Sequence, residues 1–280
     1  MRMLRESRPR VVWIQLPQVP LLWVALLYRR LYNSHAVVIS DCHNAMFRKP
    51  WCKFPFGLSI LSKSNIVLVH NADVERTAIG LGINRERLLV VEDPPASFPA
   101  EIHLTLTIDL PRPWFVFPAS FSSDEPIAEL LRAAAVVPNI SILITGNLNN
   151  CKEPTLIEQA PANVRFLGFL ERDQFEALIQ NCDAVVALTR LEDVQLSVCG
   201  EAVGAERPML VSGTPTLRRQ FPRGTVFVDS SDPSDIASGM QQLQANQQGL
   251  TEEMRAFHLQ LRSDWLRLKG KELAERISLV

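Results

Sequence analysis

Three acidic residues in the second half of the chain could provide a pair of carboxylates that binds a ligand. Glu192 and Asp193 are adjacent, and Glu201 follows Asp193 by eight residues. A carboxylate at a helix start lies near the positive end of the dipole and can accept hydrogen bonds from two neighbouring hydroxyls, such as a ribose or hexose diol. Two acids about two helical turns apart could therefore hold two parts of one sugar-bearing ligand. The alternative is that Asp193 caps the helix and Glu201 is solvated.

The elements around these acids indicate two consecutive βα units. In an α/β sheet, ligands bind at the carboxyl ends of the strands, so we expect the acidic loop to face a crevice. The apolar runs and the polar segments between them predict strands over residues 164–168, 184–188 and 209–212 and helices over 172–181 and 197–205.

The segment from Asn163 to Phe221 resembles the carboxyl-terminal domain of nucleotide-sugar glycosyltransferases of the two-domain GT-B architecture, in particular family four. The family pattern is an acid, seven residues, a glutamate, an alanine, a glycine and a proline, which here are Asp193, Glu201, Ala202, Gly204 and Pro208. The resemblance implies that Asp193 lies by the donor sugar and that Glu201 binds the ribose hydroxyls. Glu192 is the alternative for the first role.

A serine-rich loop after the predicted strand 114–118 is the candidate for binding the donor diphosphate, through helix-start N–H groups and the hydroxyls of Ser120, Ser122 and Ser123. A plain helix cap is the alternative. The family usually places an arginine and a lysine here, whereas residues 119–131 contain neither. The loop is more similar to that of β-mannosyltransferases acting on dolichol-linked chitobiose. The diphosphate would then depend on dipoles and hydroxyls, or on Arg190, Arg218 or Arg219.

Other loops carry residues that the resemblance places around the donor. Residues after the strands 141–145 and 164–168 are implied to contact the nucleoside, and the loop after strand 209–212 to face the sugar and phosphates. Taken alone, each segment also fits an ordinary turn. These candidates are Gly146, Asn147, Gly168, Phe169, Leu170 and Thr214.

His43 follows a predicted strand in the string Asp41-Cys42-His43-Asn44. Imidazole can hydrogen-bond a hydroxyl or move a proton near neutral pH. The resemblance implies that His43 points from the amino-terminal domain toward the donor sugar, and a histidine bonded to loop backbone is the alternative. Asp41 could orient the ring or act as a base, although a strand-end cap is favoured.

Composition narrows the function classes. The chain has 280 residues and a formal net charge of −1, which argues against a nucleic-acid partner. Its five cysteines form no close pair, which favours a reducing compartment, and no signal peptide is indicated, so we expect a cytoplasmic protein.

The apolar run 19–27 is too short to span a bilayer. Followed by Arg29 and Arg30, it could touch the inner membrane face, although packing on the sheet is favoured.

The alternation of strands and helices predicts an α/β protein with parallel sheets, and the resemblance implies two Rossmann-like domains. We expect a partial amino-terminal acceptor-side domain over residues 1–108, a donor-binding domain over 109–250, and a terminal helix over 251–280 that packs back across the domains. The proline-rich segment 92–113 is the expected linker. No glycine-rich loop precedes Val11, so the first domain is expected to be truncated.

The resemblance implies a hexosyltransferase-type glycosyltransferase of polysaccharide biosynthesis. It would move a sugar from a nucleotide-diphosphate donor to a hydroxyl of a glycan, a lipid-linked acceptor or a small molecule, without a cofactor or bound metal. Similarity to family four implies retention of the anomeric configuration and similarity to the β-mannosyltransferases implies inversion, so both stay open. One alternative is a non-catalytic nucleotide-sugar-binding or partner subunit, and a weaker one is a sugar-nucleotide epimerase.

Overall fold

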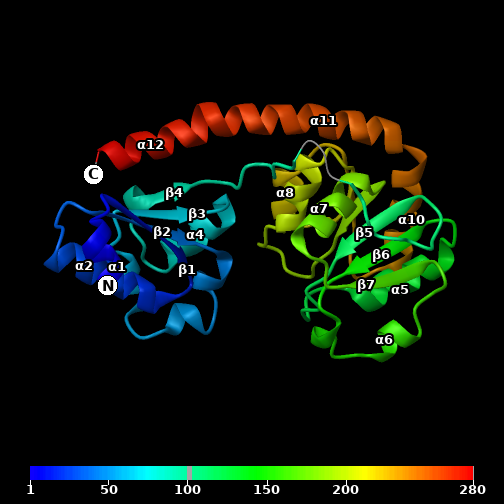
Figure 1. Ribbon diagram of the computed structural model, residues 1–280, viewed down its shortest axis with the longest axis horizontal. Helices are drawn as coiled ribbons and strands as arrows, with labels where there is room; N and C mark the ends of the chain where they lie inside the picture. Colours follow the sequence, from blue (N-terminus) through cyan, green and yellow to red (C-terminus); the bar gives the residue numbers. More distant parts are fainter. Residues whose placement is uncertain (100–102, 280) are drawn as a thin grey trace. The chain divides into compact units, whose positions relative to one another are not determined.

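The computed structural model describes residues 1–99 and 103–279, which form two α/β units, each with a parallel sheet (Figure 1). Unit 1 comprises Met1–Asp93 and Ser263–Val280, and unit 2 comprises Pro94–Arg262. The chain thus divides earlier than the expected boundary after residue 108. The described part of the expected linker contains no helix or strand, and its residues 100–102 lie outside the described residues.

Unit 1 has the sheet order β1-β2-β3-β4, wound in one direction. It begins with a short helix that the sequence did not indicate. Its strands are close to the ranges 11–16, 36–40, 66–69 and 88–91 that the apolar runs of the sequence predict. The elements are α1 (Arg2–Ser7), β1 (Val11–Leu16), α2 (Val19–Leu31), β2 (Val37–Cys42), η1 (Asn44–Phe47), η2 (Trp51–Lys53), α3 (Gly57–Leu61), β3 (Ile66–Val69), α4 (Ala72–Gly80), η3 (Arg85–Arg87) and β4 (Leu88–Val90).

The two faces of the unit 1 sheet have different partners. One face packs on α2, which buries Val19, Leu22, Ala25 and Tyr28 at helical spacing. The other face buries Val37, Ile39 and Leu68 beneath residues near the carboxyl terminus of the chain. Strands buried on both faces are continuously apolar, which explains why their ranges could be predicted.

Unit 2 has the sheet order β10-β9-β8-β5-β6-β7. The elements of its sheet and helices are β5 (Trp114–Pro118), α5 (Ile127–Val136), β6 (Ser141–Thr145), η4 (Leu148–Asn150), α6 (Thr155–Glu158), β7 (Val164–Gly168), α7 (Arg172–Asn181), β8 (Ala184–Ala187), α8 (Ser197–Gly204), β9 (Met209–Ser212), α9 (Pro215–Gln220), β10 (Thr225–Val228) and α10 (Pro233–Ala245). Helix α9 lies where the sequence indicated a turn. Its start is defined by Thr214, which caps Leu217 N, and by Pro215.

Helices cover both faces of the unit 2 sheet (Figure 1). Phe115 and Phe117 of β5 point to the face that packs on α5 and α10, and Val116 points to the face covered by α7 and α8. This is the layer arrangement of a doubly wound sheet.

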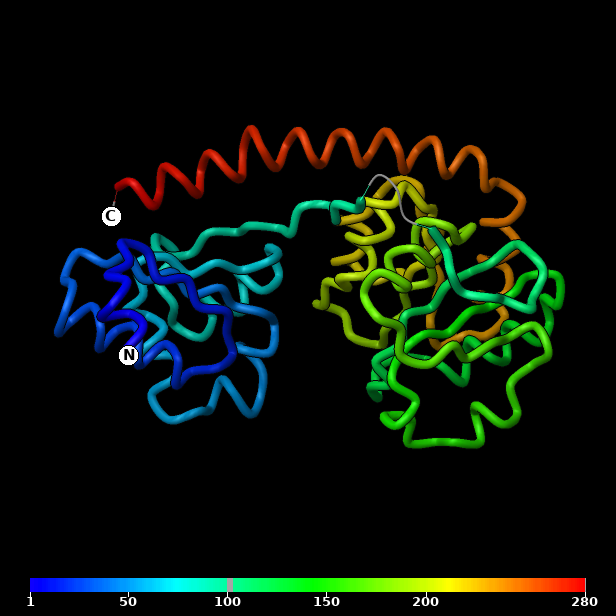
Figure 2. The backbone as a smooth tube through the Cα atoms, viewed as in Figure 1, coloured from blue at the N-terminus to red at the C-terminus, as the bar shows by residue number. Residues whose placement is uncertain are grey.

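The carboxyl-terminal residues follow one helical path (Figure 2), consisting of α11 (Gln247–Asp264), a π-helical turn η5 (Trp265–Lys269) and α12 (Gly270–Ser278). Met254 and Phe257 belong to the core of unit 2, whereas Leu273 and Ile277 pack against the sheet of unit 1. Among the described residues, no helix is long and apolar enough to cross a bilayer.

Candidate functional site

The strand order of unit 2 reverses between β5 and β8. From β5 the chain adds β6 and β7 on one side, and it then returns to add β8, β9 and β10 on the other. The loops that leave β5 and β8 therefore diverge at the centre of the sheet, which is where doubly wound sheets bind ligands. These loops, 119–126 and 188–196, contain the predicted serines and acids.

Arg190 and Thr189 tie the two loops together. Thr189 Oγ1 donates to Asp124 Oδ2 at 2.7 Å, and Arg190 N donates to Asp124 O at 2.8 Å. The Arg190 guanidinium donates to Ser123 O and Glu125 O at 3.2 Å each and pairs with Glu129 Oε2 at 2.7 Å. Arg190, a candidate for neutralising the diphosphate, therefore already balances a carboxylate of its own chain.

The amides of the serine-rich loop are also engaged. The Glu125 carboxylate accepts hydrogen bonds from Ser120 N at 3.0 Å, Ser120 Oγ at 2.7 Å and Phe121 N at 2.8 Å. Ser122 Oγ donates to Asp124 Oδ1 at 2.5 Å. The Glu125 carboxylate therefore occupies the Ser120 hydroxyl, one of the donors predicted to receive a diphosphate, together with the amides of Ser120 and Phe121. The sequence did not reveal this relationship.

The glycine-containing loops on this side of the sheet are fixed by backbone packing. Gly146 has φ 128°, and a Cβ there would lie 2.0 Å from Ala119 O. Its N–H donates to Gly168 O at 2.9 Å, and the Asn147 side chain accepts from Asn149 N. These contacts bring the loops after β5, β6 and β7 together. Phe169, next to Gly168, is 71% exposed, whereas Leu170 packs against the core.

A pocket of about 610 Å³ lies at the carboxyl ends of β8, β9 and β10. Its walls include three of the predicted donor-binding residues, Arg190, Glu192 and Thr214. Arg218 of α9 is a further cation in the wall. Its Nε donates to Gly213 O at 3.0 Å, and its guanidinium lies 4.6 Å from the centre of the Phe227 ring.

The acid pair departs from the simple helical geometry. Helix α8 begins at Ser197, so Asp193 lies in the preceding turn and Glu201 lies in the second helical turn. Glu192 is exposed on the pocket wall, whereas Asp193 and Glu201 are half-buried. Burial and the nearby Glu176 carboxylate raise the pKa of Glu201 above its usual value. Glu201 lies beyond the first turn of α8, to which the effect of the helix dipole is largely confined.

The glycine of the acid motif has a packing function. A Cβ on Gly204 would lie 2.1 Å from Ala96 O, and Ala96 N donates to Gly200 O at 3.1 Å. The chain before β5 therefore packs directly on α8. A side chain at position 204 would displace that segment and the helix that carries Glu201.

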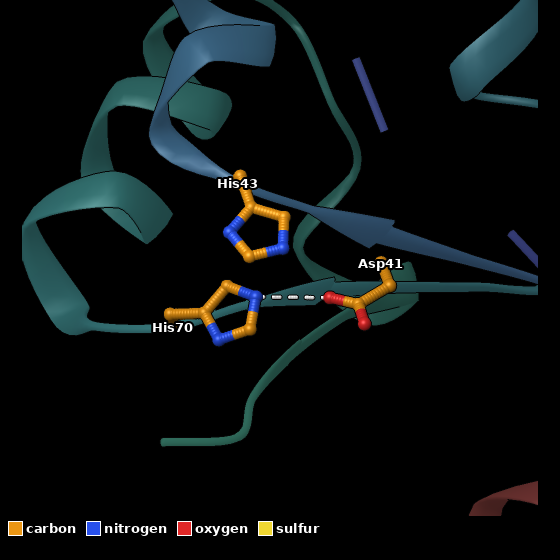
Figure 3. A group of neighbouring side chains, drawn as sticks. All are labelled: Asp41, His43 and His70. Carbon is orange, nitrogen blue, oxygen red and sulfur yellow. Dashed lines mark hydrogen bonds and ion pairs between the residues drawn. The ribbon is translucent and has the colours of Figure 1, made fainter. Parts of the chain in front are cut away.

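Unit 1 contains a separate cluster of polar side chains that includes His43 (Figure 3). Cys42, the last residue of β2, pairs with Val69, the last residue of β3, so His43 and His70 leave the two strands at the same register position. Their rings stack with centroids 4.7 Å apart, and Asp41 Oδ1 lies 2.9 Å from His70 Nε2 (Figure 3). The sequence analysis missed His70, although it directly follows a predicted strand, as His43 does.

Carboxylates flank His70 on both ring nitrogens. His70 Nδ1 lies 3.2 Å from Asp93 Oδ1, and Trp13 Nε1 donates to Asp41 Oδ2 at 3.1 Å. Burial disfavours the charge on His70, but bonds and charge interactions with Asp41 and Asp93 outweigh it and raise its pKa to about 9. Burial raises the pKa of Asp41, but the hydrogen bonds with His70 and Trp13 outweigh burial and hold that pKa below its usual value. His70 is therefore an imidazolium at neutral pH.

Comparison with solved structures shows the fold. HepE from Anabaena, crystallised with UDP and glucose, is 13% identical and matches 100% of this chain and 81% of its own, with a TM-score of 0.74. Sucrose-phosphate synthase from Thermosynechococcus elongatus is 14% identical over 98% of this chain and 76% of its own, at 0.70. A glycosyltransferase from Rickettsia africae is 11% identical over 99% and 79%, at 0.68. The chain therefore has the GT-B fold.

Sequence comparison with curated proteins finds no match. The family model described as glycosyl transferases group 1 matches residues 100–258, which is more than half of the chain. This range contains the loops 119–126 and 188–196 after β5 and β8, the pocket residues Arg190 to Asp235 and the acid motif. The chain belongs to the glycosyl transferases group 1 family.

Proposed function

We propose that the protein transfers a hexose from a nucleotide-diphosphate sugar to an acceptor hydroxyl, with the donor bound at the carboxyl edge of the unit 2 sheet. The observation that carries this proposal is the pocket at β8, β9 and β10, which lies within the matched family range and is lined by Glu192, the residue before Asp193. HepE, whose fold is related, was crystallised with UDP and glucose and, in a second structure, with UDP-glucose.

The acids bind the hydroxyl-bearing parts of the donor. A half-buried carboxylate with a raised pKa, such as Glu201, gains most when hydroxyl donors compensate its lost hydration. We assign the ribose hydroxyls to Glu201 and the hexose hydroxyls to Asp193 or Glu192, the latter on the pocket wall. Phe169, exposed after β7, together with Gly168 and Leu170, would contact the base.

Charge on the departing diphosphate requires donors within this pocket. In the transfer, the bond from the anomeric carbon to the diphosphate oxygen breaks, and the acceptor oxygen forms the new bond and loses its proton. Arg218 is the better-placed cation, because Arg190 is paired with Glu129. The backbone around Gly213 and Thr214 adds polar contacts.

The acceptor side is assigned to unit 1, with His43 as the group that contacts the sugar or moves a proton.

Helix α2 has a surface that could bring the protein to a lipid-linked acceptor in a membrane. Beside its buried face, the helix exposes Trp23, Leu27 and Leu31, which are spaced four residues apart and therefore share a second, apolar face. The exposed Arg30 lies at the end of the helix. Apolar and basic residues together favour peripheral contact with the anionic inner face of a membrane.

Vesicle co-sedimentation tests the membrane contact. Leu27→Glu should reduce binding to anionic vesicles, whereas Val136→Glu, which alters a 66% exposed side chain on unit 2, should leave it unchanged. Equal binding of both variants and the wild type would remove α2 from the proposal.

The transfer itself is tested by incubating the protein with labelled nucleotide sugars, with and without glycan and lipid-linked acceptors. Transfer, or slow donor hydrolysis, that is lost in Glu201→Gln supports the proposal. Donor isomerisation would instead identify an epimerase. Binding without turnover would identify a non-catalytic nucleotide-sugar-binding subunit. That second candidate is favoured by one observation, the occupation of the loop amides of Ser120 and Phe121 by Glu125.

A further inference from the structure

We propose that Asp41, His43 and His70 form a binding site for a divalent transition-metal ion of the zinc class. One ligand atom from each of the three side chains lies within 4.8 Å of the other two. Figure 3 shows the two imidazole rings side by side, with the carboxylate of Asp41 at one edge of the pair. The inference does not depend on the glycosyl transfer reaction, because it concerns a cluster within unit 1 alone.

The sheet brings these ligands together without help from long loops. The two histidines follow the register partners Cys42 and Val69, and Asp41 is itself paired with Leu68 of β3. Donor atoms bound to one zinc ion at about 2.0–2.2 Å lie roughly 3–3.5 Å apart. Rotation of side chains about their own bonds can contract the cluster to that size, and His70 Nε2 and Asp41 Oδ1 are already 2.9 Å apart.

Two of the three ligands, His70 and Asp41, have a neighbour that can orient them. Asp93 Oδ1 lies 3.2 Å from His70 Nδ1, so this carboxylate can hold the ring with Nε2 toward the ion. Trp13 Nε1 donates to Asp41 Oδ2 and leaves Oδ1 for coordination. Carboxylate or backbone partners of this kind usually support metal-bound histidines and raise their basicity.

Two interactions must be replaced when the ion binds. The proton between His70 Nε2 and Asp41 leaves, and the Gln15 amide, 2.6 Å from His43 Nε2, turns away from that nitrogen. Imidazole ligands favour zinc, cobalt, nickel and copper over magnesium or calcium. Three protein ligands leave a fourth position for water or another oxygen ligand.

The test uses untagged full-length protein, freed of metal with a chelator and titrated with CoCl₂. The proposal predicts uptake of about one ion per chain with the visible absorption of tetrahedral cobalt, which added Zn²⁺ displaces. His70→Gln and His43→Gln should each weaken binding by about 100-fold or more, whereas Asp93→Asn should weaken it by roughly 10- to 100-fold.

Two variants serve as controls. His35→Gln removes an exposed imidazole outside the cluster and should bind cobalt like the wild type. Gln15→Ala removes the competing amide and should bind at least as tightly. Circular dichroism establishes that each variant is folded. The proposal is overturned if the wild type takes up no cobalt, or if a folded His43→Gln or His70→Gln protein binds it as tightly as the wild type.

Discussion

The Glu125 carboxylate holds both the amide and the hydroxyl of Ser120, at 3.0 and 2.7 Å. Because the same carboxylate also accepts from Phe121 N, an acid of the chain occupies the donor groups at the end of β5. We propose that a diphosphate bound at this loop would compete with the Glu125 side chain for these donors.

Glu125→Gln should strengthen binding of nucleotide diphosphates. The substitution removes a negative charge from the serine-rich loop, the alternative candidate for binding the diphosphate, but retains an oxygen acceptor. We expect the dissociation constant of UDP to fall by about fivefold to tenfold at low salt, which corresponds to about 1 kcal/mol. Isothermal titration calorimetry measures it. Glu158→Gln, an equal charge change on the exposed helix α6, is the control and should have no effect. Weaker binding by Glu125→Gln would show that the carboxylate supports the site.

Glu201→Gln should stabilise the free protein while weakening donor binding. Burial and Glu176 disfavour the ionised carboxyl, as its raised pKa indicates, and the amide removes that unfavourable charge. We expect a gain of about 0.5 kcal/mol in the free energy of unfolding. Loss of charge-assisted bonds to two hydroxyls should weaken ribonucleotide binding by roughly 10-fold or more. Thermal unfolding and calorimetry test both parts, with exposed Glu171→Gln as the control.

Gly204→Ala and Gly200→Ala form a matched pair on α8. A Cβ at Gly204 would meet Ala96 O at 2.1 Å, whereas Gly200 has nothing within 4 Å. Overpacking should destabilise unit 2 by about 1–3 kcal/mol in the first variant. Higher helix propensity should stabilise the second by up to about 1 kcal/mol. Equal melting temperatures for the two variants would contradict the packing of residue 96 on this helix.

His70 should make the metal-free protein less stable at alkaline pH. Its folded pKa of about 9 exceeds the ordinary value of 6.5, so its stabilising contribution is full below about pH 6.5 and is lost as pH rises through 9. Thermal unfolding in the presence of a chelator should show this decline. His70→Gln should flatten the profile between these values, whereas His35→Gln should retain it. A profile unchanged by His70→Gln would remove the ion pairs with Asp41 and Asp93 from the account.

Much of the fold could be predicted because buried parallel strands are continuous apolar runs. The ranges of β3, β5, β6, β9 and α7 agree with those expected from such runs and their polar boundaries. The short helices α1 and α9 were missed, since six residues provide too little periodicity.

The site was harder to predict, because its key contacts depend on strand register and on local loop geometry. His70 meets Asp41 and His43 only through the pairing of β2 with β3. An acid before a helix, such as Glu125, has the same sequence pattern whether it faces solvent or binds the amides of its own loop. The roles of Asp193, Glu192 and the serines remain predictions for the same reason.

The central claim is that a nucleotide-diphosphate sugar binds at the carboxyl edge of the unit 2 sheet, with Arg218 against its phosphates. Calorimetric titration of UDP-sugars and other nucleotide sugars into wild type, Arg218→Ala and Arg223→Ala tests it most directly, since Arg223 is exposed outside the pocket lining. The account predicts that at least one nucleotide sugar binds the wild type and Arg223→Ala equally, and Arg218→Ala roughly 10-fold or more weakly. Equal affinity for all three proteins, or no binding of any nucleotide sugar, would contradict it.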